Sequence, residues 1–335
     1  MIVELGILAA AMLGPAHATT TTHPAHVIPT VYEAGHFYAT PETTKYQKLR
    51  LIVDTGGGGG AGMYWMTKSA ATRLGLKTRT CKVDDASISV ANVPDYKPGQ
   101  GLPPPLESRS PCGNTLIVVA EQYSDGDGQI GAGYLPGRVW TFNYPDRQLT
   151  AESSSWQPNP RAHATKLGFL RNAKGEIATG HARITIEVAG QTINMLLDTG
   201  ATAHPTKAGK EVSRTPTVNG EGVTSYIVHS VFERWHKQHP DWRVVKNGDN
   251  LTGKPTRIIE VPKVEIAGWT VGPVWFTERS DANFHQFMGQ WMDEKPDGAV
   301  GGNVFRHFVM TINYPDATAY FLCVHGCKAI GTTSN

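Results

Sequence analysis

The chain carries little charge, and no part of it concentrates charge of one sign. Asp, Glu, Lys and Arg make up 18% of the 335 residues, the formal net charge is +2, and no run of Lys and Arg occurs. Proteins that bind nucleic acid or acidic membrane surfaces need clustered positive charge. Nucleic acid and acidic membranes are therefore not the expected partners.

Long apolar runs are missing beyond the N-terminus. No later segment approaches the about 18 consecutive apolar residues of a membrane span, so no membrane contact is expected in the mature chain. The apolar stretch Leu5 to Leu13 is followed by Pro15-Ala16-His17-Ala18, a small-x-small ending typical of a signal peptidase site. We expect residues 1–18 to be a signal peptide and the protein to be secreted or periplasmic. Because Glu4 replaces the usual basic residue, a buried first strand is the alternative.

Cysteine is scarce, with four residues in total: Cys81, Cys112, Cys323 and Cys327. An even number in an exported chain suggests disulfides, and the local pairing Cys81–Cys112 with Cys323–Cys327 is expected. Free thiols are the alternative for the second pair, because its loop would be very small. The spacing is not Cys-x-x-Cys, so no metal site is expected at these residues.

Glycine and proline are abundant, at 36 and 22 residues, and indicate many turns and short strands. The alternation in Ala182 to Leu197 predicts a hairpin turning at Ala189-Gly190. Helices are expected from Thr67 to Leu76 and from Val223 to His239, the second ended by Pro240. Its His229, His236 and His239 could approach a metal, but with no acidic residue at ligand spacing we interpret them as a solvated face.

The chain contains an internal repeat. Residues 127–146 and 297–316 align without a gap and share 9 of 20 positions, including the Asn-Tyr-Pro-Asp ending at Asp146 and at Asp316. Upstream of each copy lies an apolar strand that leads into Asp-Thr-Gly, at Asp54 and at Asp198. Both halves therefore have the same order of motifs, which predicts a duplicated fold.

Asp-Thr-Gly at the end of a buried strand holds a carboxylate at the surface of a domain. The glycine allows a tight loop, and the threonine hydroxyl can bond to nearby backbone. Two such carboxylates about 4 Å apart would repel by about 4 kcal/mol at an effective dielectric constant of about 20. This is roughly three pK units, so the pair should share one proton over a wide pH range. One carboxyl can then activate water while the other donates a proton.

These motifs resemble those of the bilobal pepsin-like aspartic peptidases, each half resembling a retropepsin unit. The resemblance implies a mainly β fold of two related six-stranded-type lobes with a few short helices and an active cleft between the lobes. It implies Asp54 and Asp198 as catalytic residues, without a cofactor or metal. The implied supporting residues of the two active-site loops are Thr55, Gly56, Gly131, Thr199, Gly200, Thr202 and Gly301.

The sequence departs from the family pattern in the first half. Gln129 stands where an apolar residue is usual, and glycines 57–60 stand where a Ser or Thr often follows the motif. Without that hydroxyl we expect Asp54 to be less stabilised as an anion and the pH optimum to be less acidic. A flap over the cleft is expected within Ser87 to Gly101, with Tyr96 as the candidate flap residue and an ordinary loop tyrosine as the alternative.

The resulting hypothesis is a secreted, monomeric aspartic endopeptidase that acts on peptides or proteins. We expect an N-terminal lobe at residues 19–150, a linker at 151–165 and a C-terminal lobe at 166–335. The short exported form suggests a bacterial origin. The alternative is a catalytically silent, pepsin-like protein that binds a peptide or glycan, although both aspartates of the motif are present.

Overall fold

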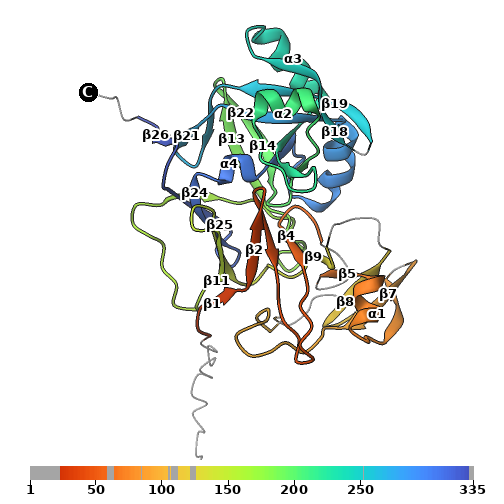
Figure 1. Cartoon of the computed structure of the whole chain (residues 1–335). Helices are drawn as coiled ribbons and strands as arrows, with labels where there is room; N and C mark the ends of the chain where they lie inside the picture. Colours follow the sequence, from red (N-terminus) through yellow and green to blue (C-terminus); the bar gives the residue numbers. More distant parts are fainter. Residues whose placement is uncertain are drawn as a thin grey trace, which may run out of the picture.

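The computed structural model describes residues 23–58, 64–83, 85–104, 106, 112–120, 126–251 and 253–331. The predicted signal peptide and the second half of the glycine run lie outside these residues. Short strands dominate and helices are few, which confirms the predicted mainly β fold. Figure 1 shows a lobe built by the first part of the chain below a lobe built by the second part.

The N-terminal lobe is built on an eight-stranded sheet in the order β2-β3-β4-β9-β5-β8-β7-β6. Two parallel pairs, β4 with β9 and β5 with β8, lie inside an otherwise antiparallel arrangement. Its strands in chain order are β2 (Thr30–Glu33), β3 (His36–Ala39), β4 (Leu51–Asp54), β5 (Trp65–Thr67), β6 (Thr78–Val83), β7 (Ala86–Asn92), β8 (Thr115–Val119) and β9 (Gly128–Gly131).

The C-terminal lobe repeats this topology in a ten-stranded sheet of order β18-β19-β22-β17-β23-β14-β13-β20-β21-β26. Across the sheet, the seven strands β13-β14-β23-β17-β22-β19-β18 lie in the same order as β3-β4-β9-β5-β8-β7-β6 of the N-terminal lobe. The parallel pairs are again at matching places, β14 with β23 and β17 with β22. The strands are β13 (Arg183–Val188), β14 (Gln191–Leu197), β17 (Ser225–Val228), β18 (Val244–Leu251), β19 (Lys254–Val261), β20 (Val264–Ile266), β21 (Trp269–Val271), β22 (Val274–Arg279), β23 (Gly298–Val300) and β26 (Cys327–Ala329).

A six-stranded sheet of order β1-β11-β10-β24-β25-β12 joins the halves. Its centre is the antiparallel pair β10 with β24, where Thr141 lies opposite Thr311 and their hydroxyls are 2.9 Å apart. The six-stranded element is thus shared between the lobes, while the sheet of each lobe is larger. The strands are β1 (His26–Ile28), β10 (Val139–Asn143), β11 (Gln148–Ala151), β12 (His163–Lys166), β24 (Phe308–Asn313) and β25 (Thr318–Cys323).

The helices are short, and one differs from its prediction. Thr67 caps α1 (Lys68–Arg73) at the predicted place. The helix expected from Val223 begins only at His229, because the β-branched segment before it forms β17 and pairs with β22 and β23. The remaining short elements are α2 (Lys207–Ser213), α3 (His229–Gln238), a π-helix η1 (Ala282–Phe287), a 3₁₀ helix η2 (Met288–Trp291), α4 (Gly302–Phe305) and the pair β15 (Thr202–Ala203) with β16 (Gly222–Val223).

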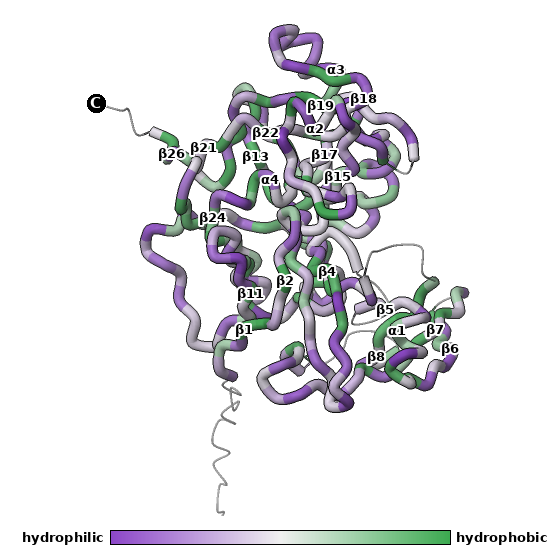
Figure 2. The backbone as a smooth tube through the Cα atoms, in the orientation of Figure 1, coloured by the Kyte–Doolittle hydropathy of each residue, from purple (hydrophilic) through white to green (hydrophobic). Residues whose placement is uncertain are grey.

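A continuous hydrophobic core runs through both lobes and includes the strands that carry the two aspartates. Leu51 and Val53 of β4 are buried, and Figure 2 shows a hydrophobic stretch along this strand. The predicted disulfides Cys81–Cys112 and Cys323–Cys327 are both formed. Within the described ranges, no helix is long and apolar enough to cross a membrane.

Candidate active site

Each Asp-Thr-Gly motif lies where a buried strand leaves its sheet. Asp54 ends β4 beside Gly131 of β9, and the backbone N–H of Asp198 donates to Val300 O of β23 at 2.9 Å. A Cβ at Gly131 would lie 2.0 Å from Gly57 O, and a Cβ at Gly301 would lie 1.8 Å from Thr224 O. The two predicted glycines are therefore required by the close approach of the backbone.

The two threonines of the motifs bind the loops to each other across the lobes. The Thr55 hydroxyl donates to Leu197 O at 2.7 Å and accepts from the Thr199 N–H at 3.0 Å. The Thr199 hydroxyl donates to Val53 O at 2.7 Å and accepts from the Thr55 N–H at 3.1 Å. Four buried hydrogen bonds thus fix the position of one loop relative to the other.

The carboxyl groups of Asp54 and Asp198 lie against each other's loop. Each accepts the N–H two residues later, from Gly56 at 2.8 Å and from Gly200 at 2.9 Å. A Cβ at Gly56 would lie 2.4 Å from Cγ of Asp198, and a Cβ at Gly200 would lie 2.2 Å from Cγ of Asp54. Glycine at these positions leaves the space in which the two carboxyls meet.

Burial and mutual contact determine how the pair holds protons. Burial raises the pKa of Asp54, and the hydrogen bond from Asp198 partly lowers it again. Burial and then the negative charge of Asp54 raise the pKa of Asp198 well above its usual range. A carboxylate beside a carboxylic acid is the state that such a pair favours, because two buried like charges cannot ionise together cheaply.

The donor to Asp54 that the sequence predicts to be missing is present, but it comes from another strand. The Gln129 side-chain amide of β9 donates to Asp54 Oδ2 at 2.5 Å. The loss of a hydroxyl after the motif therefore does not leave this carboxylate without a donor. The expectation of a less acidic optimum loses its stated reason, and the unusual residue at position 129 becomes part of the site.

The chain has a low similarity to several solved structures. Solved structures that the chain resembles include an aspartic proteinase from Irpex lacteus, with a TM-score of 0.47 and 10% identity over 93% of this chain and 100% of that one. Conglutin gamma, a basic 7S globulin from lupine seeds, and the basic 7S globulin from soybean have TM-scores of 0.46 and 0.42 at 10% identity, over 90% and 89% of this chain and 95% and 94% of theirs. No family model and no curated protein sequence matches. The chemistry of the site therefore rests on its own geometry.

Thr202 supports the second loop without touching the carboxyl of Asp198. Its hydroxyl donates to Gly200 O at 2.9 Å and lies 3.2 Å from His36 Nε2, while its N–H donates to the Tyr226 hydroxyl at 3.0 Å. Burial lowers the pKa of His36 to about 4. A neutral imidazole from the N-terminal lobe thus packs against the active-site loop of the other lobe.

Several residues near the pair were not singled out from the sequence. Tyr144 and Tyr314 of the repeated Asn-Tyr-Pro-Asp segments are both buried. Burial raises the pKa values of their phenols, and the negative charge of Asp198 adds to this at Tyr144 and that of Asp54 at Tyr314. Arg279 of β22 lies 5.0 Å from the centre of the Tyr226 ring and favours the anion of Asp198. The exact repetition of the Tyr was the available signal, whereas no local pattern marks Arg279.

Tyr96 is held inside the N-terminal lobe. Its hydroxyl is 2.6 Å from the Tyr64 hydroxyl, and its backbone forms an isolated bridge with Thr43. Burial raises the pKa of its phenol well above the usual range. The flap role of Tyr96 remains a prediction.

The helix histidines do not all lie on a purely solvated face. His229 lies with Glu233 and Glu278 in a group whose ligand atoms are within 4.8 Å of one another, so the expectation that no acidic residue joins it is wrong. Arg257 donates to the carboxylates of Glu233 and Glu278, each at 2.6 Å, which makes the group an ion-pair network.

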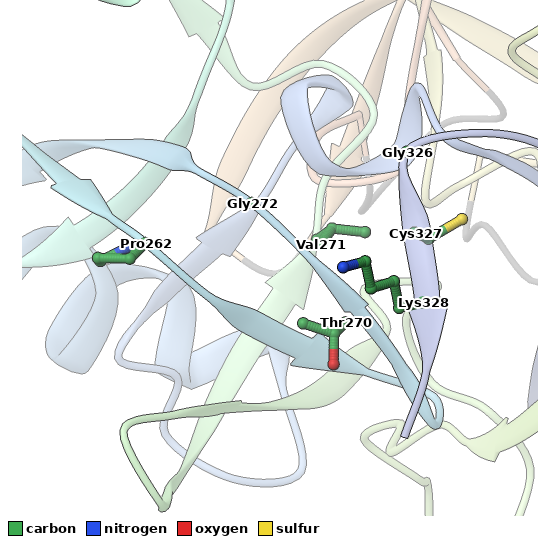
Figure 3. Close-up of a pocket in the computed structure, with 7 residues that line it drawn as sticks. All are labelled: Pro262, Thr270, Val271, Gly272, Gly326, Cys327 and Lys328. Carbon is green, nitrogen blue, oxygen red and sulfur yellow. The ribbon is translucent and has the colours of Figure 1, made fainter. Parts of the chain in front are cut away.

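The prominent hollows of the described surface lie away from the aspartates. The larger, of about 440 Å³, lies between β21 and β26 near the Cys323–Cys327 disulfide and is lined by Thr270 and Lys328 among others (Figure 3). The smaller lies where His36 and Arg50 face Glu221. Asp54 and Asp198 line neither of these two hollows.

Proposed function

We propose that the protein is an aspartic endopeptidase that hydrolyses peptide bonds between Asp54 and Asp198. The observation that carries the proposal is the contact between the two carboxyls, each placed against the glycine of the opposite loop. A carboxylate beside a carboxylic acid supplies a base and an acid at one point. Two carboxyls that share one proton are the arrangement by which aspartic proteases act, and the proposal assigns that role to this pair.

The reaction needs only water, the substrate and one shared proton. The ionised carboxylate takes a proton from water as the water oxygen attacks the peptide carbonyl carbon. The protonated carboxyl gives its proton to the carbonyl oxygen, which yields a neutral tetrahedral diol. Collapse of the diol breaks the C–N bond, with a proton passing to the leaving nitrogen, and the pair returns to one proton.

The threonine hydrogen bonds contribute by fixing the distance between acid and base. Each lobe supplies one carboxyl, so any sliding of one lobe past the other would separate them. The cross-lobe bonds of Thr55 and Thr199 oppose this motion directly behind the carboxyls. Preorganised geometry of this kind accounts for a large part of catalysis in general, and an error of about 1 Å can cost about 100-fold in rate.

The test is cleavage of a fluorescence-quenched peptide library between pH 3 and 7 by the wild type, Asp54→Asn and Asp198→Asn. Each substitution keeps the shape of the side chain and removes one acid or base. We expect cleavage by the wild type and a loss of at least about 100-fold in kcat/KM for either variant. Asp241→Asn, at an exposed position, is the matched control and should cleave like the wild type.

Equal cleavage by the wild type and both site variants would refute the proposal, because the activity would then come from elsewhere. No cleavage by any protein, together with specific binding of a peptide or glycan, would favour the silent binding protein. A peptide analogue with a hydroxyl at the scissile position, as in statine-type inhibitors, separates these outcomes. It mimics the diol and should bind the wild type far more tightly than either Asn variant.

A further inference from the structure

The two halves carry different residues at the matched positions 129 and 299 beside the carboxyls. In the N-terminal lobe Gln129 of β9 pairs with Trp65 of β5, and in the C-terminal lobe Ala299 of β23 pairs with Tyr226 of β17. The amide of Gln129 reaches Asp54 Oδ2 at 2.5 Å. The methyl group of Ala299 has no donor to offer Asp198. The duplication therefore carries a polar contact on one side only.

Gly57 makes this contact sterically feasible. A Cβ at position 57 would lie 2.1 Å from Gln129 Nε2 and 2.6 Å from Asp54 Oδ2. Any side chain at position 57 would therefore have to displace the amide or the carboxyl. The amide occupies the space that a residue with a hydroxyl would use directly after the motif, so Gln129 and Gly57 form a matched pair.

The hydrogen-bond donors around the two carboxyls are unequal as a result. Asp54 receives the Gln129 amide and the Gly56 N–H, and the N–H groups of Gly57 and Gly200 also favour its anion. Asp198 receives the Gly200 N–H. Hydrogen bonds to a carboxylate favour its ionised form, so the side with more donors should hold the negative charge.

We propose that Gln129 is a positioning residue that keeps Asp54 as the ionised member of the pair, so that Asp198 carries the shared proton. This inference rests on the proposed function and deepens it, because it assigns the base to Asp54 and the acid to Asp198. It also explains why an amide stands at a position where the sequence pattern has an apolar residue.

The other titratable groups around the pair do not reverse this assignment. Burial raises the pKa values of Tyr144, Tyr226 and Tyr314, so these phenols remain neutral through the working range. The Arg279 guanidinium favours the anion of Asp198, but its effect is smaller than those of burial and of the Asp54 charge. His36 contacts the Thr202 hydroxyl rather than either carboxyl.

The decisive measurement titrates one carboxyl at a time by ¹³C NMR of labelled aspartate. Asp198→Asn leaves Asp54 alone, and Asp54→Asn leaves Asp198 alone. Into each background we would introduce Gln129→Ala, which gives the first half the residue of the second. The pKa of Asp54 should rise by about one to two units, because a hydrogen bond to a charged group is lost. The pKa of Asp198 should not move.

A rescue variant separates a specific donor from general damage. Gly57→Ser alone should disturb the site, because its side chain meets the Gln129 amide. In the Gln129→Ala background the amide is gone, and only a small shift of the Asp54 carboxyl, whose Oδ2 lies 2.6 Å from a Cβ at position 57, is needed to accommodate the serine. Its hydroxyl can then donate to Asp54 and should return the pKa of Asp54 towards the starting value. With both aspartates present, the acid limb of kcat/KM should shift upwards with Gln129→Ala and back again in the double variant, about tenfold in rate per pH unit.

The outcomes distinguish this inference from the proposed function. Equal shifts of both carboxyls, or no shift of Asp54, would overturn the role of Gln129 even if the enzyme cleaves peptides normally. If the wild-type carboxyls titrate just as they do singly, the pair is not coupled and the proposed function itself fails. The urea midpoint of Gln129→Ala is measured beside that of the wild type. Equal midpoints show that the shift in the pKa of Asp54 does not come from a loss of the fold.

Discussion

The cross-lobe threonines provide the most direct test of how the site is held. Thr199→Val removes the hydroxyl and keeps the branched shape. The change leaves Val53 O without its donor and the Thr55 N–H without its acceptor. Both threonines are at most 1% exposed, so water cannot readily replace the lost partners. Each orphaned buried group costs about 1–3 kcal/mol, so the free energy of unfolding should fall by about 2–6 kcal/mol.

The matched control is Thr199→Ser, which keeps the hydroxyl and loses one methyl group. Removing that methyl group should cost about 1 kcal/mol. Thr55→Val should cost as much as Thr199→Val, because it removes the two symmetry-related bonds to Leu197 O and the Thr199 N–H. An equal loss in the free energy of unfolding for the two valine variants is a specific expectation of the duplicated geometry.

Urea unfolding at pH 7, followed by tryptophan fluorescence and by circular dichroism, measures the loss of stability. Peptide cleavage measured in parallel should fall more for Thr199→Val than for Thr199→Ser, since the carboxyls lose their fixed separation. If Thr199→Val is no less stable than Thr199→Ser, the four hydrogen bonds do not hold the loops together and the reasoning is wrong.

Two further predictions concern protons and space at the site. Burial lowers the pKa values of His36 and His181 to about 4. In the unfolded chain these imidazoles take up protons from about pH 6.5 downwards, which favours the unfolded state. The free energy of unfolding should therefore fall by up to about 3 kcal/mol per histidine as the pH drops from 6.5 to 4. Urea midpoints across this range should depend less on pH in the corresponding Gln variants, and an equal dependence would contradict the assignment. Gly200→Ala would place a Cβ 2.2 Å from Cγ of Asp54 and should lower kcat/KM by about 100-fold, whereas Gly289→Ala, whose nearest contact is at 3.3 Å, should leave it unchanged. Retention of most activity by Gly200→Ala would show that the carboxyls do not meet where the geometry places them.

The features that the sequence predicts well depend on residues close together in the chain. The apolar residues before Asp54 and Asp198 and the turn at Ala189-Gly190 are local signals, and the strands β4 and β14 follow them. Because the repeat preserves these signals in both halves, the meeting of the two loops could be predicted without a structure. Local pattern and duplication were sufficient for this part of the site.

The features that it misses depend on strand register. Gln129 looks like a departure from an apolar pattern until β9 pairs with β4 and places its side chain beside Asp54. The segment from Val223 was predicted to be helical, but its first part forms β17 and pairs with β22 and β23. This pairing cannot be inferred from the residues of the segment alone. Thr202 was expected to support the loop, and its contact with His36 crosses from one lobe to the other. Such contacts require the tertiary structure.

The difference between Gln129 and Ala299 bears on how a duplicated fold acquires an asymmetric reaction. With identical surroundings, two carboxyls that share a proton would hold it equally on either side, and half of the molecules would present the base on the side where a given substrate needs the acid. A difference of about one pK unit between the carboxyls changes this ratio to about tenfold. One amide, accommodated by a glycine at position 57, is enough to supply such a difference. The backbone of both lobes can then remain symmetric, with the hydrogen bonds that fix the loops intact, while the side chains assign one carboxyl as base and the other as acid.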